Sequence, residues 1–185
     1  MLGFMGGAAG ETDPRYPIGT FQYAGASSES ARRSFIDEIA ETPLRMQEAL
    51  HGLSEEQLDT PYRSGGWTVR QVAHHVPDSH LNAYVRLKLA LTEEHPVIKP
   101  YDEAQWAALP DAREAPVAIS VTLLTALHQR WTLLLRALAP ADFERRFLHP
   151  ERGVMTVDEL VALYAWHGRH HVAHITSLRE RKAWR

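Results

Sequence analysis

The chain of 185 residues is long enough to form one domain with a substantial buried core. A formal net charge of -3 and the lack of a basic stripe exclude a general polyanion binder, so we expect no nucleic-acid partner. The chain has no cysteine, which excludes disulfides, cysteine-ligated zinc and a thiol nucleophile of the protein's own.

The N-terminal segment, residues 1–13, is rich in glycine and alanine, and we predict that it is a disordered extension. It has neither a positive n-region nor a continuous apolar h-region, so it does not resemble a signal peptide. No apolar run approaches the roughly 18 residues of a membrane span. We therefore expect a cytoplasmic protein without a membrane partner, whose single domain covers residues 14–185.

The first two predicted helices follow capping signals. Ser28 and its neighbouring serines can cap a helix over about residues 28–53, in which Pro43 is expected to cause a kink or a break. A capping box at Thr68–Gln71 then predicts a second helix that ends at about Leu91.

Two further helices and two long connections complete the predicted fold. The third helix is expected over about Ile119–Leu138, and the fourth runs from a capping box at Thr156 to about Arg181. The connections, residues 93–117 and 138–155, are longer than most loops in compact domains, and such loops usually have a function or carry short structure of their own. No segment has a convincing strand pattern. These elements predict an all-α protein, a four-helix bundle with long inter-helix connections.

Four of the 11 histidines fall within eight residues of the fourth helix. At about 100° per residue, His167 and His171 lie in or beside the apolar face, His174 lies at its margin and His170 lies further round. Two imidazoles four residues apart on a helix can chelate one metal ion. Gly168 stands where the zinc protease motif has glutamate, so the protease interpretation fails. We favour a metal-binding pair over two separately hydrogen-bonded core histidines, and a supporting or surface role for His170 and His174.

A second histidine cluster lies on the second predicted helix. His74 is expected to point away from the core, whereas His75 flanks the apolar face and His80 lies closer to it. A third imidazole from another helix would complete a three-histidine site with an open position, and His75 and His80 compete for that place. The row of His75 continues with polar residues three or four apart: Ser79, Asn82 and Arg86. Such a row can line a pocket or be a solvated flank.

Motifs along nearly the whole chain after Asp13 resemble the DinB superfamily, most closely its YfiT-like branch. That branch is described as metal-dependent hydrolases and includes a bacillithiol S-transferase. Besides the histidine clusters, the matching segments are Arg15–Gly19, Leu58–Arg63, Gly65–Val72, Asp78–His80, Arg86–Glu93, Pro100–Glu103 with Trp106, and Trp166–Ile175.

The resemblance implies a four-helix bundle of the DinB/YfiT type, usually a homodimer, with one divalent metal ion per chain. By position, the three histidines that hold the ion in this family correspond to His75, His167 and His171. The resemblance therefore favours His75 over His80, a choice that spacing alone left open. The family metal is zinc or nickel, and we expect zinc; three imidazoles suit zinc, nickel, copper or iron, so the ligands alone do not decide among them.

A metal ion with an open coordination position can activate water for hydrolysis or a thiol cosubstrate for transfer to an electrophile. The partners would then be a small-molecule substrate or a low-molecular-weight thiol with its electrophile. Bacillithiol carries carboxylates, which arginine binds well. Among Arg63, Arg70 and Arg86, the last shares the His75 row and is the best candidate.

The predicted substrate-binding residues are Ser79, Asn82, Arg86, Glu103 and Trp106. Glu103 and its neighbour Asp102 lie in the long connection and could reach over the site as part of a lid. The catalytic residues themselves remain unassigned, because no carboxylate stands out as a general base. The alternative function is a non-catalytic metal-binding or stress-response module. A fourth protein ligand, for example His80 or His174, would close the site and favour that alternative.

Overall fold

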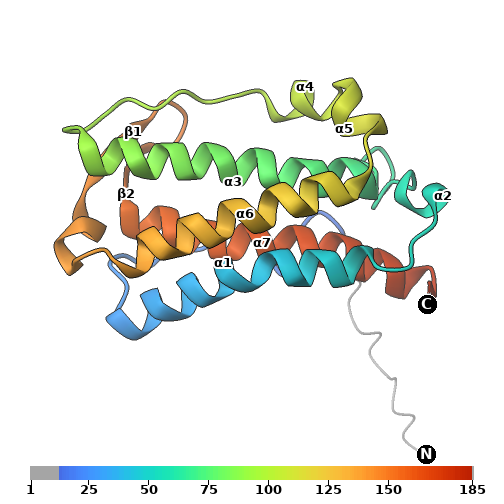
Figure 1. The fold of residues 1–185 in the computed structure, drawn as a ribbon, viewed down its shortest axis with the longest axis horizontal. Helices are drawn as coiled ribbons and strands as arrows, with labels where there is room; N and C mark the ends of the chain where they lie inside the picture. The colour runs from blue at the N-terminus through green and yellow to red at the C-terminus, as the bar shows by residue number, and fades with distance from the viewer. Residues whose placement is uncertain (1–12, 185) are drawn as a thin grey trace, which may run out of the picture.

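Four long helices dominate the computed structural model, which describes residues 13–184 (Figure 1). They are α1 (Glu29–Leu50), α3 (Val69–Thr92), α6 (Val117–Arg136) and α7 (Val157–Arg181). Each lies within a few residues of a predicted helix, and the predicted four-helix bundle is confirmed. The predicted disordered extension lies outside the described residues, apart from Asp13. None of the described helices is long and apolar enough to cross a membrane.

Side-chain caps begin three of the four helices where the sequence predicts them. Ser28, Thr68 and Thr156 each accept a hydrogen bond from the backbone N–H three residues further on. A kink or a break was predicted at Pro43, but helix α1 continues through this residue without ending there. Pro43 is buried on a helix that packs against both α6 and α7, and this packing outweighs the backbone hydrogen bond that proline removes.

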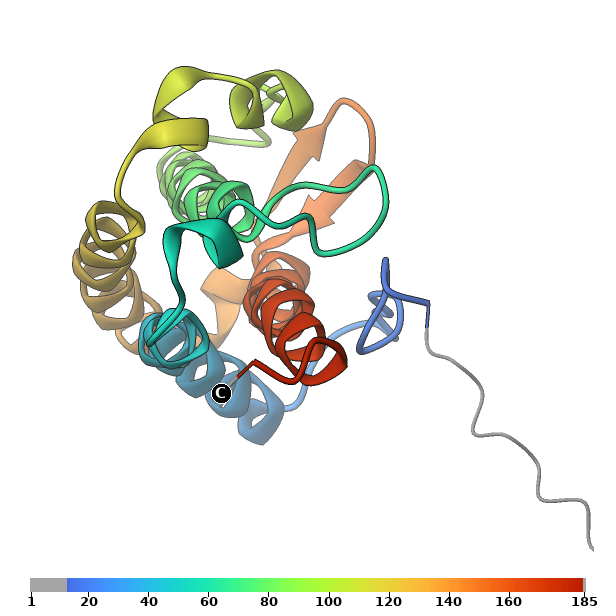
Figure 2. The same cartoon turned by 90° about the vertical axis from the view of Figure 1, so that its right-hand side faces the viewer.

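Each long helix packs against two of the other three. Helices α1 and α3 both contact α6 and α7, so α1 lies diagonally opposite α3 when the bundle is viewed end-on (Figure 2). Helices α3 and α6 run in the same direction, as do α1 and α7 (Figure 1). A short loop cannot join parallel neighbours, so the chain must return along α3, whose 24 residues span about 36 Å.

The long connection from residue 93 to residue 116, here called the crossover, makes this return. It carries two short helices, α4 (Glu103–Ala107) and α5 (Pro110–Glu114), which contact α3 on the outside of the bundle (Figure 1). Another short helix, α2 (Glu55–Leu58), lies between α1 and α3. The length of the crossover was predicted, with short structure as one option, but the positions of its two helices were not, because each has only five residues.

The connection between α6 and α7 contains a β-hairpin, which corrects the expectation that no strand is present. A 3₁₀ helix, η1 (Pro140–Glu144), precedes β1 (Arg146–His149), which pairs antiparallel with β2 (Gly153–Thr156). Phe147 faces Met155 in the register, and both side chains are buried. Strands of four residues are too short to show a clear alternation in the sequence.

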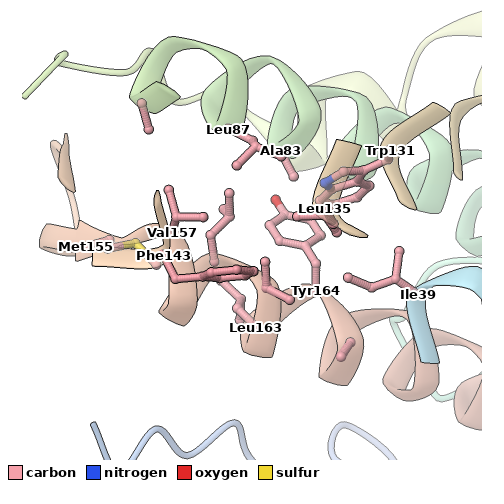
Figure 3. Close-up of a cluster of buried hydrophobic side chains, with 14 of the residues drawn as sticks. Ile39, Ala83, Leu87, Trp131, Leu135, Phe143, Met155, Val157, Leu163 and Tyr164 are labelled. Carbon is pink, nitrogen blue, oxygen red and sulfur yellow. The ribbon is translucent and has the colours of Figure 1, made fainter. Parts of the chain in front are cut away.

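The buried core consists of two apolar clusters along the bundle. Figure 3 shows the first, in which Leu87 of α3, Trp131 of α6 and Tyr164 of α7 point toward one another. The second lies further along and includes Met46, Val76, Leu124 and Ile175. Between Tyr164 and Ile175, helix α7 carries its four histidines. The polar site therefore lies in the interior, between two apolar clusters that fix the spacing of α3 and α7.

Candidate metal centre

Three histidines from two neighbouring helices converge inside the bundle. His75 of α3 and His167 and His171 of α7 each offer one ring nitrogen, and the three nitrogens lie within 4.8 Å of one another. The ring centroid of His75 is 5.3 Å from that of His167 and 4.7 Å from that of His171. Within residues 13–184, this is the one group of histidine and acidic donors that could hold a metal ion.

The glycine between the two α7 histidines has a packing role. A Cβ atom on Gly168 would lie 2.6 Å from Oγ1 of Thr42 on α1 and 2.8 Å from its Cγ2. Only a residue without a side chain permits this close approach of α7 to α1. Gly168 thus excludes the zinc protease motif and also sets the position of the helix that carries His167 and His171.

The converging imidazoles are neutral at physiological pH. The pKa of His75 is lowered to about 4, chiefly by burial and in smaller part by the positive charges that His174 and His170 would carry. Burial is also the main reason why the pKa values of His167 and His171 lie below their usual value. Neutral imidazole is the form that coordinates a metal ion, so the three residues are ready for binding without losing a proton.

The two residues that could have closed the site lie elsewhere. Ring nitrogens of His80 are 2.8 Å from His128 and 3.1 Å from His167, and His80 does not belong to the converging group. His174 lies 3.4 Å from His171 and 3.2 Å from the carbonyl oxygen of Arg15. Among the described residues, the group therefore has no fourth histidine or acidic member.

His74 differs from its predicted orientation. The side chain is 6% exposed, with Nδ1 2.7 Å from the hydroxyl of Ser120 and Nε2 3.0 Å from the carbonyl oxygen of Ala115. The expectation that it points away from the core followed from the helical angle of α3 alone. The end of the crossover and the start of α6 cover that face of α3, which the angle could not reveal.

A cavity of about 680 Å³ opens beside His167. Its walls come from α3, the crossover, the β-hairpin and α7. Three of the predicted substrate-binding residues, Ser79, Arg86 and Glu103, line it. The other two do not: the amide of Asn82 donates to the Asp78 carbonyl at 2.9 Å, and the half-exposed ring of Trp106 packs on Tyr101 instead.

The cavity wall contains polar groups that lack partners within the described part of the chain. Arg86 is 9% exposed, and its Nε atom is buried without a hydrogen bond, as is the hydroxyl of Tyr101. Burial raises the pKa of Glu103 and lowers that of His149, both of which line the cavity. Asp102, the other acidic residue expected in a lid, caps α4 through the N–H of Gln105. Glu103 is thus the more available carboxyl group.

The sequence profile of the DinB superfamily matches residues 38–175, which includes all three converging histidines. The chain belongs to the DinB superfamily. Two relatives from this superfamily are 55% identical to it, one from Bacillus mycoides over 172 residues and one from Oceanobacillus iheyensis over 170 residues. The alignments cover 93% and 92% of this chain and 99% and 98% of the relatives. Both relatives carry the name "putative metal-dependent hydrolase".

A solved structure has the same fold as this chain. YfiT from Bacillus subtilis is 46% identical, and its superposition has a TM-score of 0.91 over 93% of this chain and 99% of that chain. It is described as "a probable metal-dependent hydrolase with an unusual four-helix bundle topology". The diagonal placement of α1 and α3, with a crossover between parallel helices, agrees with that description of the topology.

Several residues around the centre of this DinB superfamily protein carry little signal in the sequence. Tyr101, His149 and Arg152 line the cavity, yet each comes from a connection whose path a periodicity cannot predict. His128 is the single histidine of helix α6, and such a residue is more often a hydrogen-bonded core group than part of a site. Only the contact of His128 with His80, which in turn contacts His167, links it to the converging histidines.

Proposed function

We propose that this protein is a divalent-metal-dependent hydrolase whose ion is held by His75, His167 and His171. The observation that carries the proposal is the convergence of three neutral imidazoles within 4.8 Å, beside a cavity large enough for a small molecule. Three histidines without a fourth protein ligand are the donor set of a catalytic rather than a structural site. Imidazole suits zinc, which we expect, and also nickel. The names of the DinB superfamily relatives support metal dependence and hydrolysis.

A divalent ion bound there supplies Lewis acidity, which acidifies water or a thiol and polarises a substrate carbonyl. The chain's own residues bind and orient the substrate. Arg86, with its unpaired Nε, is suited to hold a carboxylate or another anion of the substrate. Burial raises the pKa of Glu103, which favours the protonated carboxyl group and suits a residue that exchanges a proton with the substrate. Residues 100–104 of the crossover form one wall of the cavity in which these groups lie.

Thiol transfer to an electrophile is the second candidate. The chain has no cysteine, so a thiol would have to come from a cosubstrate. Arg86 and Arg152 on the cavity wall favour an anionic one, such as bacillithiol with its carboxylates. The homodimer, the cytoplasmic location and these small-molecule partners stay predictions.

Elemental analysis of protein purified without chelator tests the metal centre. We expect about one zinc or nickel ion per chain in the wild type, in line with a single three-ligand site, and none in His171→Ala. The matched control is His51→Ala, because His51 is exposed at the end of α1 and should leave the metal content unchanged. A wild type that binds no ion on titration would refute the proposal.

Activity assays then separate the functions. The metal-loaded wild type is offered esters and amides that carry a carboxylate, and in parallel a low-molecular-weight thiol with a model electrophile. Hydrolysis that is lost in His171→Ala supports the first candidate, and thiol transfer that is lost in the same variant supports the second. A stoichiometric ion without either reaction would favour the non-catalytic metal-binding module.

A further inference from the structure

Two chains of hydrogen-bonded histidines lead away from the proposed metal ligands on α7. In the first, Nδ1 of His167 lies 3.1 Å from Nε2 of His80, and Nδ1 of His80 lies 2.8 Å from Nε2 of His128. Nδ1 of His128 in turn lies 2.5 Å from the carbonyl oxygen of Ile39. This chain links three of the four long helices to a backbone carbonyl of the remaining one, α1.

The second chain is shorter and leads to the N-terminal segment. Nδ1 of His171 lies 3.4 Å from Nδ1 of His174, and Nε2 of His174 lies 3.2 Å from the carbonyl oxygen of Arg15. Both chains thus begin at a proposed ligand and end at a backbone carbonyl oxygen. That shared end point determines where the protons lie, because a carbonyl oxygen can only accept a hydrogen bond.

The protons of the first chain follow from its carbonyl end. His128 must carry its proton on Nδ1 to donate to Ile39, and a neutral imidazole has no second N–H. Its Nε2 therefore accepts from Nδ1–H of His80. By the same reasoning, Nε2 of His80 accepts from Nδ1–H of His167. The proton of His167 is thereby held on Nδ1, and Nε2 keeps its lone pair.

The second chain gives the same result for the other ligand. His174 donates from Nε2 to the Arg15 carbonyl, so its Nδ1 has a lone pair and accepts from Nδ1–H of His171. Nε2 of His171 is then free. The Ser79 hydroxyl, 3.4 Å from Nε2 of His167, is compatible with this assignment, because a hydroxyl can donate to that lone pair.

An additional proton on the first chain would not fit its surroundings. His80 is fully buried and His128 is 1% exposed, and within residues 13–184 neither makes an ion pair with a carboxylate. A buried imidazolium without a counter-ion is costly. The first chain also ends at a carbonyl in the core, which cannot pass a proton on. It therefore orients His167 and does not conduct protons to solvent.

We propose that His80, His128 and His174 are positioning residues that hold His167 and His171 in the Nδ1–H tautomer, so that each presents Nε2 to the metal ion. This role rests on the metal centre proposed above. Ligating histidines commonly donate their second N–H to a fixed acceptor, and loss of that acceptor typically costs about 10–100-fold in metal affinity. Here other histidines, themselves anchored by backbone carbonyls, are the acceptors.

The tautomers can be measured directly on the full-length protein. Long-range ¹H–¹⁵N spectra of histidine-labelled protein, recorded after chelator treatment, distinguish a proton on Nδ1 from a proton on Nε2. We expect Nδ1–H for His80, His128, His167 and His171, and Nε2–H for His174. A proton on Nε2 of either His167 or His171 would overturn the proposal, whatever the metal content.

Zinc affinity, measured by competition with a chelating dye, tests the consequence. His174→Phe keeps a ring but removes the acceptor of His171, and we expect a loss of about 10–100-fold. The matched control is His170→Phe, because His170 lies on the same helix with similar burial and its Nδ1 has no partner among the described residues. The control should bind zinc about as tightly as the wild type. His128→Phe tests the first chain in the same way, and circular dichroism confirms that each variant is folded.

The outcomes separate this proposal from the metal centre itself. Tight zinc binding by the wild type with an unchanged affinity in folded His174→Phe would overturn the positioning role and leave the metal centre intact. Failure of the wild type to bind zinc or nickel would overturn the metal centre, and with it the role of the chains. A loss in His174→Phe that His170→Phe does not share supports both.

Discussion

The close approach of α7 to α1 at Gly168 leads to a quantitative prediction. An alanine there would place its Cβ 2.6 Å from Oγ1 and 2.8 Å from Cγ2 of Thr42. The Thr42 side chain is 1% exposed, and its hydroxyl donates to the Glu38 carbonyl at 2.9 Å. It cannot turn away without losing that hydrogen bond, so Gly168→Ala must move α7 or break the bond.

Two opposing effects set the size of the change. Replacing a helical glycine with alanine stabilises a helix by about 1 kcal/mol. Overpacking a buried contact costs about 1–3 kcal/mol, and the lost Thr42 hydrogen bond costs about 1 kcal/mol more. We expect Gly168→Ala to lower the free energy of unfolding by about 1–3 kcal/mol. At about 2–4 °C per kcal/mol for a chain of this size, the Tm should fall by several degrees.

A double-mutant cycle with Thr42→Ala isolates the contact, using urea unfolding of the metal-free protein. Thr42→Ala removes both close atoms and leaves only Cβ, at 3.3 Å. In that background Gly168→Ala should be neutral or stabilising by up to about 1 kcal/mol, so the coupling energy should be about 1–4 kcal/mol. The reasoning would be refuted if Gly168→Ala lowered the free energy of unfolding equally in both backgrounds. It would also be refuted if Gly168→Ala alone were as stable as the wild type.

Three further outcomes can be measured. Burial raises the pKa of Asp158, but hydrogen bonds, chiefly from Arg32, outweigh it and bring the pKa below its usual 3.8. The ionised carboxylate therefore stabilises the folded state above pH 3.8, and this stabilisation is lost as the pH falls through the lower pKa of the folded state. The difference in unfolding free energy between the wild type and Asp158→Asn should stay constant from about pH 5 to 7 and shrink at lower pH. Burial lowers the pKa of His75 and His128 to about 4, so the unfolded chain takes up protons below pH 6.5 that the folded chain does not. Unfolding of metal-free protein should therefore become easier from pH 6.5 to 4, by up to about 1.4 kcal/mol per pH unit for each such group, and a flat profile would contradict this. Arg86→Gln should raise KM for carboxylate-bearing substrates by about tenfold or more with little change in kcat, and an equal effect on neutral substrates would argue against anion binding.

Local signals in the sequence predict the long helices and two of the converging histidines. A cap such as Thr68 acts within one turn, and the spacing of His167 and His171 determines that they share a face of α7. These interactions depend on residues close together in the chain, so a short window of sequence contains them. The match to a known family then selected His75.

Interactions between distant residues explain what the sequence does not predict. His128 contacts a carbonyl 89 positions away, and no periodicity links α6 to α1. His74 is buried because the segment around Ala115 crosses it, and Trp106 misses the cavity because the crossover turns it toward Tyr101. The β-hairpin is defined by pairing between strands that are individually too short to recognise.

The crossover has a consequence for how the site can diversify. Because α3 and α6 are parallel, the bundle cannot form without a segment that runs back along its length, and this segment supplies Pro100–Ala104 to the cavity wall. It contributes none of the three converging histidines. Substitutions or insertions in it can therefore reshape this wall of the cavity while the three converging histidines stay in place. The connectivity of the helices thus puts part of the cavity wall and the converging histidines on different segments, so each can vary on its own.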